Sequence, residues 1–173
     1  MFGLFRKKQT PGSDGPQPPG ILLEAPSPHG NAHAVVEADE RCVYFYLCGA
    51  NPDFGMRTCW VRNLVRAPED VDWNVAQQGQ APLNPAKHCR APLGSALPLA
   101  RDLGVVWLPE GNGIALYEKS TLLAIIPPWS GTEAFHGYAA EAVGSGPLAS
   151  TLAYNQGSDA LLASLPSDRW TEC

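Results

Sequence analysis

Short apolar runs separated by turn-forming residues follow one another along most of the chain. Seven of these runs have the length and the β-branched or aromatic content of β-strands, and they cover residues 21–24, 34–37, 42–48, 56–65, 104–108, 114–118 and 121–126. Turns of hairpin length separate several of them, such as residues 38–41 and 119–120. The pattern therefore predicts two antiparallel meanders, one on each side of a proline-rich stretch.

Two of these runs have the composition of strands that are covered on both faces. In residues 42–48 two tyrosines between two cysteines lie on one face, and a valine, a phenylalanine and a leucine lie on the other. Residues 121–126 are the start of the most hydrophobic segment of the chain, and Pro127 and Pro128 end it because proline cannot donate a ladder hydrogen bond. We expect both runs to be central strands.

Three further segments have helical features. Residues 67–78 begin with a proline and acidic residues that suit a first turn, and Gly79 would end that helix. Residues 132–143 and 158–165 follow capping residues. Together with the strands, these segments predict an α+β fold, built on an antiparallel sheet of about six or seven short strands with two or three short helices.

The distribution of proline and glycine divides the chain into three parts. Residues 1–20 form a Pro/Gly-rich segment that lacks the apolar residues to order itself, so we expect a disordered tail. Residues 21–148 carry the predicted α+β domain, and residues 149–173 form a C-terminal tail with one short helix. A chain of 173 residues is long enough for one such domain with its own core.

The net charge of the chain argues against nucleic acid as a partner. The chain carries −5, and the first eight residues hold three cations and no acid, so the rest carries −8. An acidic body repels phosphate backbones.

No run approaches the roughly 18 apolar residues that a membrane span needs. The five irregularly spaced cysteines, without a secretory signal, indicate reduced thiols. We expect a cytoplasmic protein with no integral membrane association.

Candidate chemistry is sparse. The cysteines lack the paired C-x₂-C spacing of zinc sites, and no phosphate-binding loop or nucleophile elbow occurs, so we expect no metal and no cofactor. Cys89 follows His88, and His136 lies among aromatic residues, so a small hydrolase or transferase using His136 or Cys89 is the alternative to a binding role.

An aromatic loop after the apolar run is the candidate contact region. It contains Trp129, Ser130, Phe135, His136 and Tyr138 around two glycines. Tryptophan and tyrosine are over-represented among the residues that dominate protein interfaces. We therefore predict that these five residues bind a protein partner and that none is catalytic.

Four stretches carry a family resemblance to the N-terminal region of bacterial proteins that contain a suppressor-of-fused domain. They are Val-Tyr-Phe-Tyr-Leu at residues 43–47, Gly-Met-Arg-Thr-Cys-Trp-Val-Arg-Asn-Leu at 55–64, Ile-Ile-Pro-Pro-Trp-Ser-Gly at 125–131 and Phe-His-Gly-Tyr-Ala at 135–139. The resemblance covers residues 21–148, and the chain diverges after Ala149 as a truncated or naturally short member would. It implies a non-enzymatic immunity protein that binds and neutralises a toxin.

Overall fold

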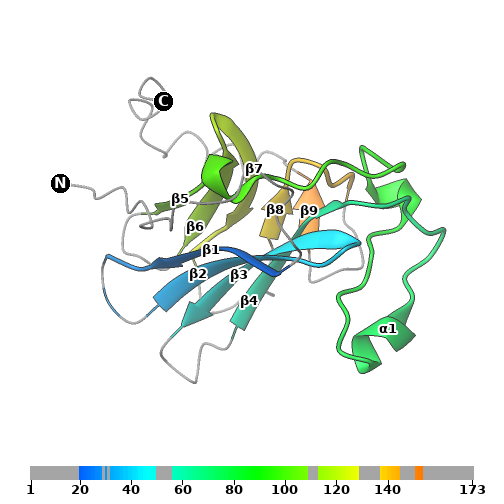
Figure 1. The fold of residues 1–173 in the computed structure, drawn as a ribbon, viewed down its shortest axis with the longest axis horizontal. Coiled ribbons are helices and arrows are strands. Elements are labelled where there is room, and N and C mark those ends of the chain that lie inside the picture. Colours follow the sequence, from blue (N-terminus) through cyan, green and yellow to red (C-terminus); the bar gives the residue numbers. More distant parts are fainter. Residues whose placement is uncertain are drawn as a thin grey trace.

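The computed structural model describes residues 20–28, 30, 32–49, 56–108, 113–128, 137–144 and 151–153, the last three through their backbone. Within these residues the chain forms nine strands, one α-helix and two short 3-10 turns. The strands build two sheets, one from each half of the chain, which are shown together in Figure 1.

The first sheet is a four-stranded antiparallel meander in the order β1-β2-β3-β4. Its strands are β1 (Gly20–Pro26), β2 (Ala32–Ala38), β3 (Cys42–Gly49) and β4 (Met56–Asn63). Val43 pairs with Arg62 while Tyr44 pairs with Trp60, so Val61 is an extra residue in β4 and forms a bulge. Beyond the bulge, residues 60–63 are all buried.

The second sheet has the order β5-β6-β7-β8-β9. Its strands are β5 (Leu103–Trp107), β6 (Ile114–Glu118), β7 (Thr121–Ile126), β8 (Gly137–Ala139) and β9 (Thr151–Ala153). The pairs are antiparallel except for β8 and β9, which run parallel. Lys119 makes the β6–β7 turn in the left-handed region, with a φ of 54°.

One large apolar cluster joins the two sheets. Val36 and Phe45 of the first sheet and Leu116 and Ile126 of the second belong to it, and all four are at most 2% exposed. The sheets approach each other closely at β4 and β8, where a Cβ on Gly137 would lie 2.6 Å from the Cβ and Sγ atoms of Cys59. Only glycine permits that approach.

A long connection, residues 64–102, joins the sheets and covers part of the first one. It contains α1 (Trp73–Gln77) and 3-10 turns at Ala86–His88 and Ala100–Asp102. The buried Arg62 of β4 binds it by donating from Nη1 to the carbonyl of Ala96 at 3.2 Å. The same guanidinium makes ion pairs of 3.2 Å with Glu118 through Nη2 and with Glu141 through Nε, so it connects both sheets and the connection.

The predicted α+β class is wrong, because the described chain is mainly β. Each of the seven predicted strands has an observed counterpart, but the strands form two sheets instead of one. The predicted helix at 67–78 shortens to the five residues of α1, since Ala67 donates to the Pro92 carbonyl and Pro68 accepts from Ala86 instead of joining a helix. Within the predicted helix at 132–143, residues 137–139 are β8. The predicted helix at 158–165 lies outside the described residues.

Candidate functional site

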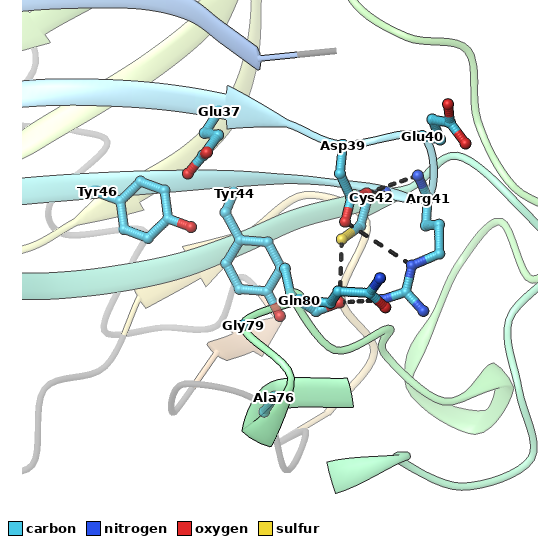
Figure 2. A pocket seen from close by; sticks show the side chains of 11 residues that line it. Glu37, Asp39, Glu40, Arg41, Cys42, Tyr44, Tyr46, Ala76, Gly79 and Gln80 are labelled. Carbon is cyan, nitrogen blue, oxygen red and sulfur yellow. Dashed lines mark hydrogen bonds and ion pairs between the residues drawn. The ribbon is translucent and has the colours of Figure 1, made fainter. Parts of the chain in front are cut away.

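A recess opens between the β2–β3 turn and the segment that follows α1 (Figure 2). It has a volume of about 580 Å³. The first sheet supplies the charged and aromatic lining, and α1 with its following segment supplies small and polar residues. The lining residues are Glu37, Asp39, Glu40, Arg41, Cys42, Tyr44, Tyr46, Ala76, Gly79, Gln80 and Ala81.

Asp39 fixes the shape of the β2–β3 turn. Its Oδ1 atom accepts hydrogen bonds from the backbone N–H groups of Arg41 at 2.6 Å and Cys42 at 2.8 Å. Aspartate often closes a turn in this way, because its short side chain reaches the backbone two residues on. Its Oδ2 atom lies 3.9 Å from Nε of Arg41, so the carboxylate and the guanidinium offset each other's charge.

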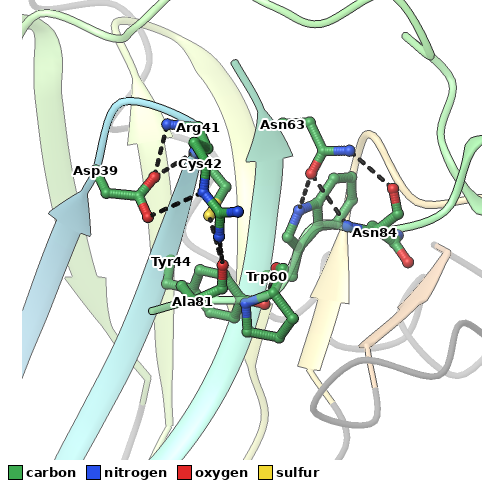
Figure 3. A network of polar contacts seen from close by, with 9 residues as sticks. Asp39, Arg41, Cys42, Tyr44, Trp60, Asn63, Ala81 and Asn84 are labelled. Carbon is green, nitrogen blue, oxygen red and sulfur yellow. Dashed lines mark hydrogen bonds and ion pairs between the residues drawn. The ribbon is translucent and has the colours of Figure 1, made fainter. Parts of the chain in front are cut away.

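Three contacts from the first sheet hold the opposite wall in place (Figure 3). The Arg41 guanidinium donates to the carbonyl of Ala81, and the Cys42 thiol lies 3.9 Å from the same oxygen. The hydroxyl of Tyr44 donates to the carbonyl of Pro82 at 2.7 Å. The recess is therefore built between two segments that are bonded directly to each other.

The end of α1 contributes the rest of the wall through a glycine-containing cap. Gly79 adopts a φ of 77°, donates to the Ala76 carbonyl at 3.1 Å, and is followed by Gln80, whose N–H donates to Val75 at 2.9 Å. This pair of bonds is a Schellman cap, which needs a left-handed residue. The prediction that Gly79 ends the helix is confirmed, and the cap turns residues 79–81 into the recess.

Two tyrosines form the aromatic side of the recess. The rings of Tyr44 and Tyr46 are stacked, with centroids 6.1 Å apart and planes inclined by 21°. Burial raises the pKa of Tyr44, with smaller contributions from neighbouring groups, and burial followed by the charge of Glu37 raises the pKa of Tyr46. Both hydroxyls therefore remain protonated at neutral pH.

The lining is acidic. It holds three carboxylates and one guanidinium, and the guanidinium is already paired with Asp39. Glu37 and Glu40 are exposed, and among the described residues neither has an ion-pair partner. The carboxylates of Glu37 and Glu40 are therefore available for an ion pair with a ligand in the recess.

A buried polar network anchors the segment that follows the recess wall, at Asn84, to β4 (Figure 3). The side-chain oxygen of Asn63 accepts from Nε1 of Trp60 at 2.9 Å and from the backbone N–H of Asn84 at 3.1 Å. Its Nδ2 atom donates to the Asn84 carbonyl at 2.8 Å. Asn63 and Asn84 are both 1% exposed, so this reciprocal pair fixes the connection to the end of β4 through buried hydrogen bonds.

Cys89, one of the two alternative catalytic residues, belongs to this network. The thiol donates to the Asn84 carbonyl at 3.3 Å, and the side chain is 7% exposed. Burial, followed by the charge of Glu141, raises the pKa of Cys89 to about 11. The neighbouring His88 directs Nδ1 towards the carbonyl of Val143, at 3.3 Å. A nucleophilic cysteine needs a lowered pKa, so this thiol has the opposite environment.

The structure describes one of the five predicted contact residues. Tyr138 lies on β8, pairs with Ile125 of β7 and is half-buried. The other four, Trp129, Ser130, Phe135 and His136, lie outside the described residues, so for them the contact role stays a prediction. His136 as a catalytic residue stays a prediction for the same reason.

Sequence analysis did not identify the recess. The alternation in β3 placed Tyr44 and Tyr46 on one face, and the turn at residues 38–41 is rich in charge, but the wall comes from residues some 40 positions later. Antiparallel pairing places Glu37 directly opposite Tyr44, and that register was the available signal.

Comparisons with protein-family models, curated proteins and solved structures found no match. In the part of the chain that the structure describes, no group of three or more His, Cys, Asp or Glu side chains has an arrangement that could hold a metal ion. Among the same residues, no helix is long and apolar enough to cross a membrane.

Proposed function

We propose that this chain is a protein-binding domain whose contact surface includes the recess beside the β2–β3 turn. The observation that supports the proposal most directly is the lining, where stacked Tyr44 and Tyr46 and two carboxylates without ion-pair partners among the described residues face an opening of about 580 Å³. Tyrosine offers a large contact area with few rotatable bonds, which is why it is frequent at interface hot spots.

Trp73 extends this surface. It is 53% exposed and lies three residues before Ala76, which lines the recess, so the two share one side of α1. An exposed tryptophan next to a tyrosine-lined recess suits an interface, because Trp and Tyr are enriched among the few residues that dominate binding energy.

The resemblance to suppressor-of-fused domain-containing proteins gives the proposal its specific form, a cytoplasmic immunity protein that neutralises a toxin. The enzymatic alternative gains no support from Cys89, whose thiol is buried and protonated. A second contact region for the same partner would comprise the predicted contact residues Trp129, Ser130, Phe135, His136 and Tyr138.

A reconstituted complex tests the proposal. The intact chain is used as bait in the source cell, the captured protein is purified separately, and the affinity of the two is measured by calorimetry. We expect a stoichiometric complex that Trp73→Ser weakens about tenfold or more, as loss of a hot-spot residue does. Leu93→Ser is the matched control, because Leu93 is 76% exposed on the same connection and does not line the recess. Equal affinity of both variants would refute the assigned surface.

A further inference from the structure

We propose that the recess binds an arginine side chain from a basic segment of the partner, with the guanidinium between the ring of Tyr46 and the carboxylate of Glu37. This inference rests on the proposed protein-binding function and names the chemistry of the group that the recess receives. The evidence for it is the charge of the recess lining, the stacked tyrosine rings and the pairing register of the first sheet.

The charge of the lining selects a cation. Asp39 and Arg41 are paired with each other, which leaves Glu37 and Glu40 as the uncompensated charges of the lining among the described residues. An anionic group entering the recess would meet two carboxylates, and a neutral group would leave them unpaired. A cation at the Tyr46 end of the recess instead gains from the charge of Glu37.

The geometry of the sheet places a carboxylate beside an aromatic face. Glu37 of β2 is directly opposite Tyr44 of β3, and Tyr46 is its diagonal neighbour on the same face. After burial, the charge of Glu37 and a hydrogen bond from the Tyr46 hydroxyl to its carboxylate raise the pKa of Tyr46, and Figure 2 shows both side chains on one side of the recess. One cation can therefore contact a carboxylate and a ring together.

Guanidinium fits this arrangement better than ammonium. It is planar and weakly hydrated, it stacks on aromatic faces, and its fork of N–H donors pairs with a carboxylate. Lysine carries a compact, strongly hydrated charge that cannot stack in the same way.

Short peptides test the inference without the natural partner. Acetyl-Gly-Arg-Gly-amide is titrated into the ¹⁵N-labelled full chain, beside the lysine peptide and the citrulline peptide, which has nearly the same shape as arginine without its charge. We expect the arginine peptide to shift the amides of Glu37, Tyr46 and Gly79, and the citrulline peptide to leave them in place. Affinity for the lysine peptide should be lower.

Variants assign the two contacts. Glu37→Gln should weaken arginine binding about fivefold, which corresponds to a salt bridge near the protein surface. Glu24→Gln is the matched control, since it removes the same charge from an exposed position on β1 outside the recess lining. Tyr46→Leu should weaken binding about threefold, and Tyr46→Phe should restore it because the ring face is kept.

Several outcomes would overturn the inference. Equal affinity for the arginine and citrulline peptides removes the role of charge, and equal affinity for the lysine peptide removes the stacking arrangement. If a partner binds the chain while the arginine peptide does not, the proposed function stands and this inference fails. If the arginine peptide binds as expected and no partner is captured, the recess binds a guanidinium and the proposed protein-binding function fails.

Discussion

Replacing Asn63 by leucine tests how the recess wall is held. The side chain is 1% exposed, accepts from Nε1 of Trp60 and the backbone N–H of Asn84, and donates to the Asn84 carbonyl. Leucine has a similar size, so the change leaves little empty space and acts mainly by removing hydrogen-bond partners.

The expected cost follows from the groups that lose a partner. The two buried donors, one on Trp60 and one on Asn84, would lose the Asn63 oxygen, whereas the Asn84 carbonyl would keep the thiol of Cys89. The buried backbone N–H of Asn84 is left without the Asn63 acceptor, which costs about 1–3 kcal/mol, so the free energy of unfolding should fall by at least about that amount.

Urea denaturation followed by circular dichroism measures this loss. Asn74→Leu is the control, because Asn74 is exposed on α1 and the same substitution there should change stability by less than about 0.5 kcal/mol. A loss below about 1 kcal/mol for Asn63→Leu would show that the polar pair does not anchor the connection, and the account of the recess wall would fail.

Three further predictions concern the packing and titration of the described residues. Gly137→Ala should lower the free energy of unfolding by about 1–3 kcal/mol, because the added methyl group overlaps Cys59. Adding Cys59→Gly to that variant should recover part of the loss. Calorimetric melting that shows no loss for Gly137→Ala would contradict the close approach of β4 and β8. Arg62→Met should cost roughly 2–4 kcal/mol because the partly buried Glu118 and Glu141 lose the guanidinium, and only Glu141 keeps a hydrogen bond, from Ser95. Lys87→Met, which breaks an exposed pair, should cost less than about 1 kcal/mol, and similar denaturation midpoints for the two variants would reject the linking role of Arg62. The raised pKa of Cys89 means that the folded state holds its proton more tightly than the unfolded state, so this thiol stabilises the fold below about pH 9 and the stabilisation is lost as the pH rises through about 11. Denaturation between pH 8 and pH 11 should therefore show a shallower alkaline decline for Cys89→Ala than for the wild type, and parallel curves would contradict the raised pKa.

The strands could be predicted because their signal is local. In runs such as residues 42–48 and 114–118, the residue types within the run are enough to predict a strand. Turn residues such as Asp39 and Gly79 are predictable because each stabilises the backbone conformation of its own turn. The helix expected across residues 132–143 is wrong at residues 137–139, because Gly137 is needed where β8 meets Cys59 and no local pattern reveals that contact. Tertiary packing overrode propensity there.

The candidate site was missed for the same physical reason. Tyr44 and Arg41 are unremarkable in a strand and a turn until Pro82 and Ala81 accept their hydrogen bonds, and those partners lie about 40 residues away in a proline-rich stretch. Within such a stretch, side-chain periodicity gives no register. The buried pair of Asn63 and Asn84 is likewise a long-range contact between residues that each look like ordinary loop or strand-end positions.

Mapping the partner on the chain tests the central claim most directly. Amide chemical shifts of the ¹⁵N-labelled full chain are compared with and without the purified partner. The account predicts that the largest changes fall on residues 37–46 and 73–81, around the recess. Changes concentrated on β8 and on strands far from the β2–β3 turn, with residues 37–46 unmoved, would contradict it.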